Sequence, residues 1–196
     1  MIQNVIFDFG NVIGKFDPNG ILSYFCDREE DKQILSEALF HDWKVLDAGT
    51  LPYEDYIRDS LAMLPERLHP VAEDFFRDWY RHFPYVDGVP ELIDELKSKN
   101  VPVYLLSNAP VHFSQHADYF KVLDGFSGIL FSGDIQLVKP NREIYEYFLH
   151  KFSLNPAECF FLDDLEANIE GAKACGINGM VFDGNIAAAR KALGLK

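Results

Sequence analysis

The chain has 196 residues, 31 of them acidic and 18 basic, so its formal net charge at pH 7 is −13. This excess of negative charge argues against nucleic acid or an anionic membrane surface as a partner. Hydrophobic residues make up 48% of the chain, but no apolar run is long enough to span a bilayer. Three cysteines without metal-ligand spacing favour reduced thiols. We therefore expect a globular, cytoplasmic protein; the sequence does not indicate its oligomeric state.

The first apolar run, residues 2–7, predicts a buried strand that ends abruptly at Asp8. An unpaired carboxylate at the end of a buried strand is costly, so Asp8 is a candidate nucleophile or metal ligand, with a turn cap as the alternative. Gly10 and Gly14 predict a tight, irregular turn after it.

The next segment changes character, with apolar residues at helical spacing among many charges. It predicts four helices, near residues 18–25, 34–40, 52–61 and 70–82. We expect residues 15–86 to form a helical cap inserted into a core of residues 1–14 and 87–196.

Strands and helices alternate after residue 86, which predicts a parallel sheet with helices on both faces. The fold class is therefore a three-layer, Rossmann-like α/β core with a four-helix cap. The expected strands are residues 101–106, 129–131, 159–162 and 181–182. The expected helices are residues 89–96, 111–120, 143–152, 167–175 and 186–193.

Polar residues follow three of these strands: Asp8, the pair Ser107-Asn108, and the pair Asp163-Asp164. Parallel strands end at one edge of a sheet, where open α/β sheets bind ligands, so these residues are expected to converge. Lys139, before a proline that opens a helix, can reach the same edge.

Three clustered carboxylates repel one another unless positive charge neutralises them. A Mg²⁺ ion together with Lys139 would do so, since oxygen ligands without His or Cys favour Mg²⁺. A carboxylate nucleophile beside Mg²⁺, a lysine and hydroxyl or amide donors is typical of phosphoryl transfer.

These residues, in the segments DFGNV (8–12), SN (107–108), KP (139–140) and DD (163–164), resemble the four motifs of the haloacid dehalogenase superfamily. The variants are most similar to its bacterial sugar-phosphate phosphatase branch. The resemblance implies Mg²⁺-dependent hydrolysis of a small phosphate monoester, such as a sugar phosphate, through an aspartyl-phosphate. In this resemblance Asp8 is the nucleophile, and Lys139 is the partner of Asp8 and of the phosphate. Ser107 and Asn108 are the phosphate ligands. The implied metal ligands are Asp8, Asp164 and the Gly10 carbonyl, and Asp163 supports the metal indirectly.

Gly10 departs from the phosphatase pattern, which places a second aspartate there to protonate the leaving group. General acid–base catalysis typically increases a reaction rate by about 10²–10⁴-fold. Without it, sugar 1-phosphates and aryl phosphates should be better substrates than 6-phosphates. A preference for 6-phosphates would indicate a proton donor elsewhere, and the first candidates are Asp17, His41, Asp42 and His112.

Two alternatives stay open. A metal-independent 2-haloacid dehalogenase would also use an Asp nucleophile without a second aspartate, but it gains nothing from Asp163 and Asp164. A catalytically weak phosphate-binding member is favoured by Gly10 and disfavoured by the intact Asp8 and Lys139.

Overall fold

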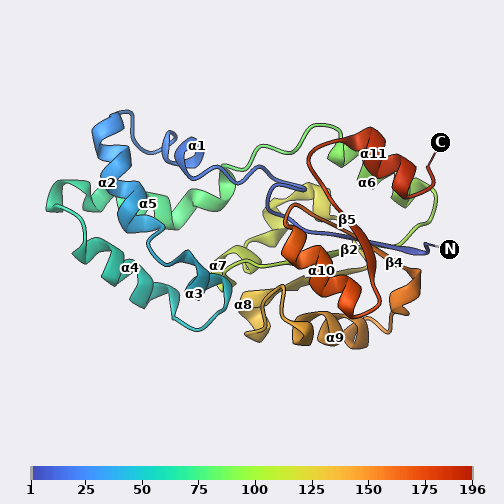
Figure 1. The fold of residues 1–196 in the computed structure, drawn as a ribbon. Coiled ribbons are helices and arrows are strands. Elements are labelled where there is room, and N and C mark those ends of the chain that lie inside the picture. Colours follow the sequence, from blue (N-terminus) through green and yellow to red (C-terminus); the bar gives the residue numbers. More distant parts are fainter. Residues whose placement is uncertain (1, 196) are drawn as a thin grey trace.

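The structure, a computed structural model, describes residues 2–195 and is built on a parallel five-stranded sheet (Figure 1). The strands follow the order β3-β2-β1-β4-β5, so β1 lies at the centre. Their bounds are β1 (Asn4–Phe7), β2 (Val103–Ser107), β3 (Gly128–Phe131), β4 (Cys159–Asp163) and β5 (Asn178–Val181). Every residue of β1, β2 and β4 is buried, because helices cover both faces of the sheet.

Side chains of β1 alternate between two apolar layers, as the pleat of a strand requires. Val5 and Phe7 pack on the side of α6 (Val89–Ser98) and α11 (Ile186–Ala192). Ile6 packs on the other side, with α9 (Arg142–Lys151) and α10 (Glu166–Ala174). The three-layer α/β core expected from the sequence is therefore confirmed.

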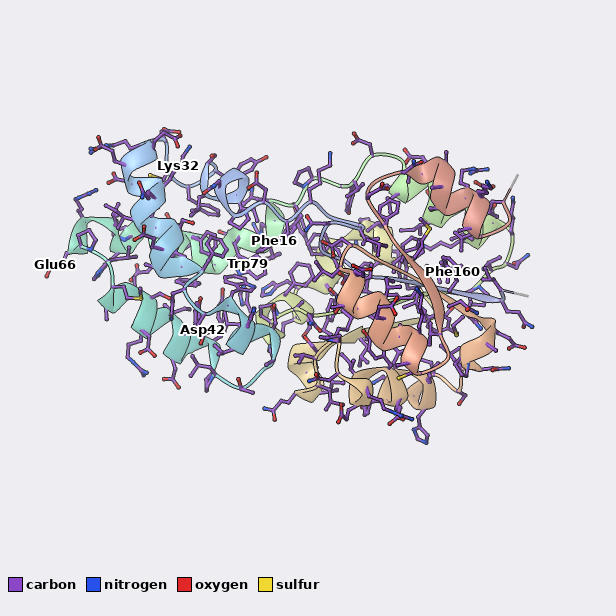
Figure 2. The ribbon with its side chains drawn as sticks, in the orientation of Figure 1. Phe16, Lys32, Asp42, Glu66, Trp79 and Phe160 are labelled. Carbon is purple, nitrogen blue, oxygen red and sulfur yellow. The ribbon has the colours of Figure 1, made fainter. Side chains whose placement is uncertain are left out.

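The cap is a separate block of helices beside one end of the core (Figure 1). It holds α1 (Pro18–Leu22), α2 (Glu29–Leu39), α3 (Trp43–Asp47), α4 (Tyr53–Ala62) and α5 (His69–Asp78), with 3-10 helices at Glu66–Leu68 and Trp79–Arg81. Phe16 and Trp79 lie on the side of the cap that faces the core, and Lys32 and Glu66 lie at its far end (Figure 2).

Two neighbouring segments join the cap to the core. The Lys15 backbone N–H donates to the Pro84 carbonyl at 2.8 Å, and the Val86 N–H donates to the Ile13 carbonyl at 2.9 Å. The chain thus enters and leaves the cap as a hydrogen-bonded pair next to the predicted limits, residues 15 and 86.

Several elements differ from the sequence prediction. The cap contains α3 in addition to the four expected helices, and α8 (Ser132–Ile135) was not expected. The predicted helix 111–120 is a short α7 (Val111–Ser114) followed by 3-10 turns at Ala117–Tyr119 and Lys121–Leu123.

The last strand is residues 178–181, not 181–182 as predicted. Its bounds follow from its pairing with β4, and the apolar pattern does not reveal them. A Cβ at Gly179 would lie 2.6 Å from the Phe161 carbonyl oxygen and 3.2 Å from the Ile169 side chain. A glycine that a strand pattern would disfavour is therefore the residue that fits between β4 and α10.

Candidate active site

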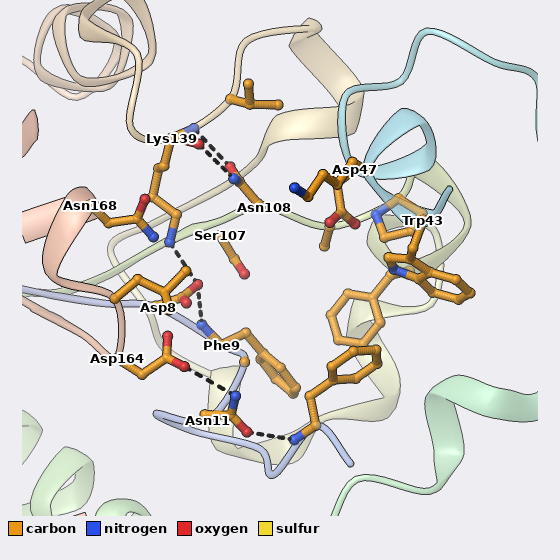
Figure 3. A pocket seen from close by; sticks show the side chains of 18 of the residues that line it. Asp8, Phe9, Asn11, Trp43, Asp47, Ser107, Asn108, Lys139, Asp164 and Asn168 are labelled. Carbon is orange, nitrogen blue, oxygen red and sulfur yellow. Dashed lines mark hydrogen bonds and ion pairs between the residues drawn. The ribbon is translucent and has the colours of Figure 1, made fainter. Parts of the chain in front are cut away.

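The polar residues after β1, β2 and β4 meet at one edge of the sheet, together with Lys139 (Figure 3). Asp8 follows β1 directly, and its backbone N–H donates to the Leu162 carbonyl at 2.9 Å, which fixes it beside the end of β4. The Phe9 N–H donates to Asp8 Oδ1 at 2.7 Å and orients the carboxylate. The predicted convergence of the strand ends thus places Asp8 at the centre of the cluster.

Lys139 is buried between two carboxylates. Its Nζ lies 2.9 Å from Asp8 Oδ1 and 2.6 Å from Asp163 Oδ2. Burial alone would lower the pKa of Lys139, but Asp8 and Asp163 outweigh it, so the pKa is raised and the ammonium stays charged. Burial raises the pKa of Asp8 to about 6, against the opposing pull of Lys139 and with a further increase from Asp163. Lys139 therefore favours the ionised form of Asp8 against the effect of burial.

Asp163 is saturated with hydrogen bonds. Its Oδ1 accepts from the Leu165 N–H at 2.9 Å, and its Oδ2 accepts from Lys139. The Asn168 Nδ2 donates to both oxygens, at 2.9 and 3.0 Å, and Tyr145 holds Asn168 by donating its hydroxyl to the Asn168 carbonyl at 2.8 Å. Asp163 thus positions Lys139 and has little lone-pair capacity left for a metal ion.

Ser107 and Asn108 line the same cavity. The Ser107 hydroxyl lies against Asp8 and helps to lower its pKa. The Asn108 side chain holds the backbone of residue 139 in both directions, donating to its carbonyl at 3.0 Å and accepting from its N–H at 2.9 Å. Asn108 therefore fixes the loop that carries Lys139, in addition to the phosphate contact that its backbone was expected to make.

Asp8, Asp163 and Asp164 each offer an oxygen within 4.8 Å of the others, a carboxylate cluster that suits a hard divalent cation. Asp164 Oδ2 accepts from Asn11 Nδ2 at 3.1 Å, and Asn11 Oδ1 accepts from the Phe16 N–H at 3.0 Å. Burial raises the pKa of Asp164, so neutralising positive charge would favour its ionised form. The donor set fits Mg²⁺, and Asn11 links it to the start of the cap.

Gly10 lies in the loop beside this cluster. A Cβ built on it meets no atom within 4 Å, and its φ is outside the left-handed region. A Cβ at residue 10 would therefore be accommodated without strain. Glycine at this position is not required by packing.

The cluster forms the floor of a cavity of about 760 Å³ between core and cap. Aromatic rings from both parts line the rest of it: Phe9, Phe16, Trp43, Trp79, Phe83 and Phe113. Trp43 and Asp47, from the cap, face Asp8 and Asp164 across this space (Figure 3). Asp47 has no distinguishing feature in the sequence, because only the docking of α3 on the core brings it over the site.

The proton donors suggested from the sequence lie elsewhere, which corrects that suggestion. The Asp17 side chain accepts a hydrogen bond from the Asn19 N–H at the start of α1. Asp42 is exposed and immediately precedes α3 in the chain. His41 stacks on Tyr56 with ring centroids 4.7 Å apart. His112 lines a separate cavity of about 490 Å³, where burial lowers its pKa to about 4. None of these four residues lines the main cavity.

The sequence model of the haloacid dehalogenase-like hydrolases matches residues 2–176, and the chain therefore belongs to this family. Sesquiterpene phosphatase astK of Aspergillus oryzae is 34% identical over 97 residues, covering 49% of this chain and 50% of that protein. D-ribitol-5-phosphate phosphatase of Bacteroides thetaiotaomicron is 28% identical over 187 residues, covering 90% of this chain and 89% of that protein. The chain spans about half the length of the first curated relatives that it matches.

Solved structures share the fold. A HAD family enzyme of Bacteroides thetaiotaomicron, in complex with magnesium and inorganic phosphate, superposes with a TM-score of 0.72 at 22% identity, covering 94% of this chain and 96% of that one. No helix within residues 2–195 combines the length and the apolar character that crossing a membrane requires.

Proposed function

We propose that the protein is a Mg²⁺-dependent phosphatase that hydrolyses a small phosphate monoester through an aspartyl-phosphate. The observation that carries this proposal is the Asp8–Lys139–Asp163 cluster, buried at the floor of a cavity and joined by Asp164. Phosphatases among the relatives, and the magnesium and phosphate complex of a protein with the same fold, support it.

In this proposal the Asp8 carboxylate attacks phosphorus, and the ester oxygen leaves from the opposite side. Lys139 keeps Asp8 ionised, and the Ser107 hydroxyl and the Asn108 backbone hold the phosphoryl oxygens. Asp8, Asp164 and the Gly10 carbonyl would hold Mg²⁺, with Asp163 acting indirectly. When bound, Mg²⁺ supplies positive charge against which the phosphate oxygens are held. Water then cleaves the aspartyl-phosphate and frees Asp8.

We propose a sugar phosphate as the substrate class. The faces of sugar rings carry C–H groups that pack on aromatic rings, and Phe16 and Trp43 offer such rings beside the polar groups of Asp47 and Asn108. The same walls would also suit an aromatic or isoprenoid leaving group, so such esters belong in the screen. The proposed partner is a small phosphate ester.

A screen of metabolite phosphates tests the function directly. We expect phosphate release that requires Mg²⁺ and is lost when the metal is chelated. Esters of sugars, aryl alcohols and isoprenoid alcohols, assayed at equal concentration, would identify the leaving group. Halide release from 2-haloacids that survives chelation would instead establish the dehalogenase alternative. A protein that binds phosphate but forms no complex with beryllofluoride at Asp8 would be the non-catalytic alternative.

The two neighbouring aspartates should differ in their effect on Mg²⁺ affinity. The Asp163 oxygens accept hydrogen bonds from Lys139, Leu165 and Asn168, so Asp163 acts on the metal only indirectly. Asp163→Asn should therefore weaken Mg²⁺ binding by about 10–100-fold, as removal of an indirect partner does. Asp164→Asn, which replaces a direct ligand, should weaken it further. Calorimetric Mg²⁺ titration measures both, with Asp183→Asn, an exposed aspartate after β5, as the control. Equal or reversed effects would mean that Asp164 is wrongly assigned as the direct ligand.

A further inference from the structure

The cavity contains five side chains that can titrate: Asp8, Lys44, Asp47, Lys139 and Asp164. Three of them, Asp8, Lys139 and Asp164, belong to the cluster on the floor. Lys44 is exposed at the edge. Asp47 is the remaining carboxyl group, and it lies on the cap side, facing the floor (Figure 3).

The backbone that carries Asp47 is bound to the core. The Ser132 hydroxyl donates to the Asp47 carbonyl, and the Ala109 N–H donates to the same hydroxyl at 3.0 Å. The Gln136 side chain donates to the Gly49 carbonyl at 2.8 Å. Ser132 is fully buried, so the two hydrogen bonds of its hydroxyl are shielded from water, whereas the Gln136 bond is exposed. Asp47 is therefore held over the site by the core itself.

Close packing at Gly49 reinforces this attachment. Gly49 has a φ of +63°, and a Cβ there would lie 2.2 Å from the Gly133 carbonyl oxygen. Only glycine combines this backbone conformation with such close approach. The loop after α3 thus reaches the core backbone, and the position of Asp47 follows from that contact.

The surroundings of Asp47 favour a protonated carboxyl group near neutral pH. Burial raises the pKa of Asp47 to about 7, and the negative charge of Asp8 adds to the increase. Lys139 and a hydrogen bond from the Trp43 indole oppose it. An acid with a pKa close to the working pH is well suited to donate a proton and take one back.

The proposed reaction needs such a group on this side of the cavity. An in-line attack by Asp8 expels the ester oxygen on the far side of phosphorus, away from the floor. Gly10 has no side chain with which to protonate that oxygen. We infer that the Asp47 carboxyl group is the catalytic acid that protonates the leaving oxygen. This inference rests on the proposed phosphatase function.

The protons and bonds balance over the two half-reactions. In the first, the Asp8–phosphorus bond forms, the phosphorus–oxygen ester bond breaks, and Asp47 transfers its proton to the departing alkoxide, releasing an alcohol. In the second, water attacks phosphorus, the Asp8–phosphorus bond breaks, and the Asp47 carboxylate takes the proton of the water. Asp8 and Asp47 both return to their initial states.

The dependence on the leaving group tests this role. In Asp47→Asn, kcat/KM for alkyl phosphates such as sugar 6-phosphates should fall by about 10²–10⁴-fold, and that for 4-nitrophenyl phosphate by less than about tenfold. The reason is that 4-nitrophenolate departs without protonation. The alkaline limb of the wild-type pH profile, expected near pH 7, should also disappear, because Asp47 loses its proton there. The matched control is Asp42→Asn, which changes an exposed aspartate of the same cap segment and should leave both readouts unchanged.

Other results would overturn the inference. An equal loss for every leaving group, with raised KM, would show that Asp47 binds substrate without donating a proton. A wild type that hydrolyses no phosphate ester would overturn the proposed function, and this role with it. Should Asp47→Asn fail to fold by circular dichroism, Trp43→Phe serves instead. The indole N–H lowers the Asp47 pKa, so its loss should move the alkaline limb to higher pH; an unmoved limb would contradict the role of Asp47.

Discussion

Asp8→Asn is expected to reduce phosphate release to background, a loss of about 10⁴-fold or more, the scale seen when a nucleophile is removed. The amide has nearly the shape of the carboxylate but cannot attack phosphorus. Its oxygen can still accept from the Phe9 N–H and from Lys139, which keeps its second partner Asp163. The free energy of unfolding should therefore hold or rise, because a buried negative charge is removed from beside Asp163.

Steady-state phosphate release and chemical denaturation, measured on the same preparation, check both parts. Asp183→Asn is the control, because this exposed aspartate follows the outer strand β5 at the same sheet edge. Activity of the Asp8 variant near that of the wild type would remove Asp8 from the role of nucleophile. Lost activity together with lost stability would indicate a structural role instead.

Lys139→Met should be the most destabilising of the substitutions considered. It leaves the buried Asp8 and Asp163 without their shared cation, and breaking a buried ion pair typically costs about 3–5 kcal/mol. Activity should also be lost, because Asp8 would lose the cation that favours its ionised form. Without Lys139, burial would hold the pKa of Asp8 still further above its value in the unfolded chain, so the loss of stability is full at neutral pH and shrinks as the pH falls.

Urea unfolding of wild type and variant from about pH 5 to about pH 8 measures this difference. Lys173→Met is the control, because Lys173 forms an exposed pair with Glu170 at 2.8 Å, and such pairs contribute about 0–1 kcal/mol. If the Lys139 variant were as stable as this control at every pH, Lys139 would contribute no more to stability than an exposed lysine does.

The floor of the site could be predicted because its residues are tied to local pattern. Asp8, Ser107 and Asp163 each end an apolar strand, and parallel strands necessarily bring such ends together. The pairing of β1 with β2 and β4 therefore suffices to place these three residues together, although long stretches of chain separate them. Apolar spacing also located α6, α9, α10 and α11, which cover the sheet, but not α7 and α8.

The cap side of the site, where Asp47 lies, could not be predicted in this way. Asp47 is one of 31 acidic residues, and its own segment shows no feature that distinguishes it. Its position depends on a hydrogen bond to Ser132, 85 residues later in the chain, and on the contact between Gly49 and Gly133. Strand β5 was misplaced for a related reason, because Gly179 is chosen by the space between β4 and α10 and not by strand propensity.

The open space at Gly10 has a consequence for divergence within the family. Since no neighbour constrains a Cβ there, the identity of residue 10 can change without disturbing the nucleophile loop or the sheet beneath it. A lineage that keeps this scaffold can therefore gain or lose a second carboxylate by one substitution, and reaction preference can drift while the fold stays constant. A Cβ at residue 10 therefore has no packing cost, and the chemistry of the nucleophile loop can change at a position that the surrounding fold leaves free.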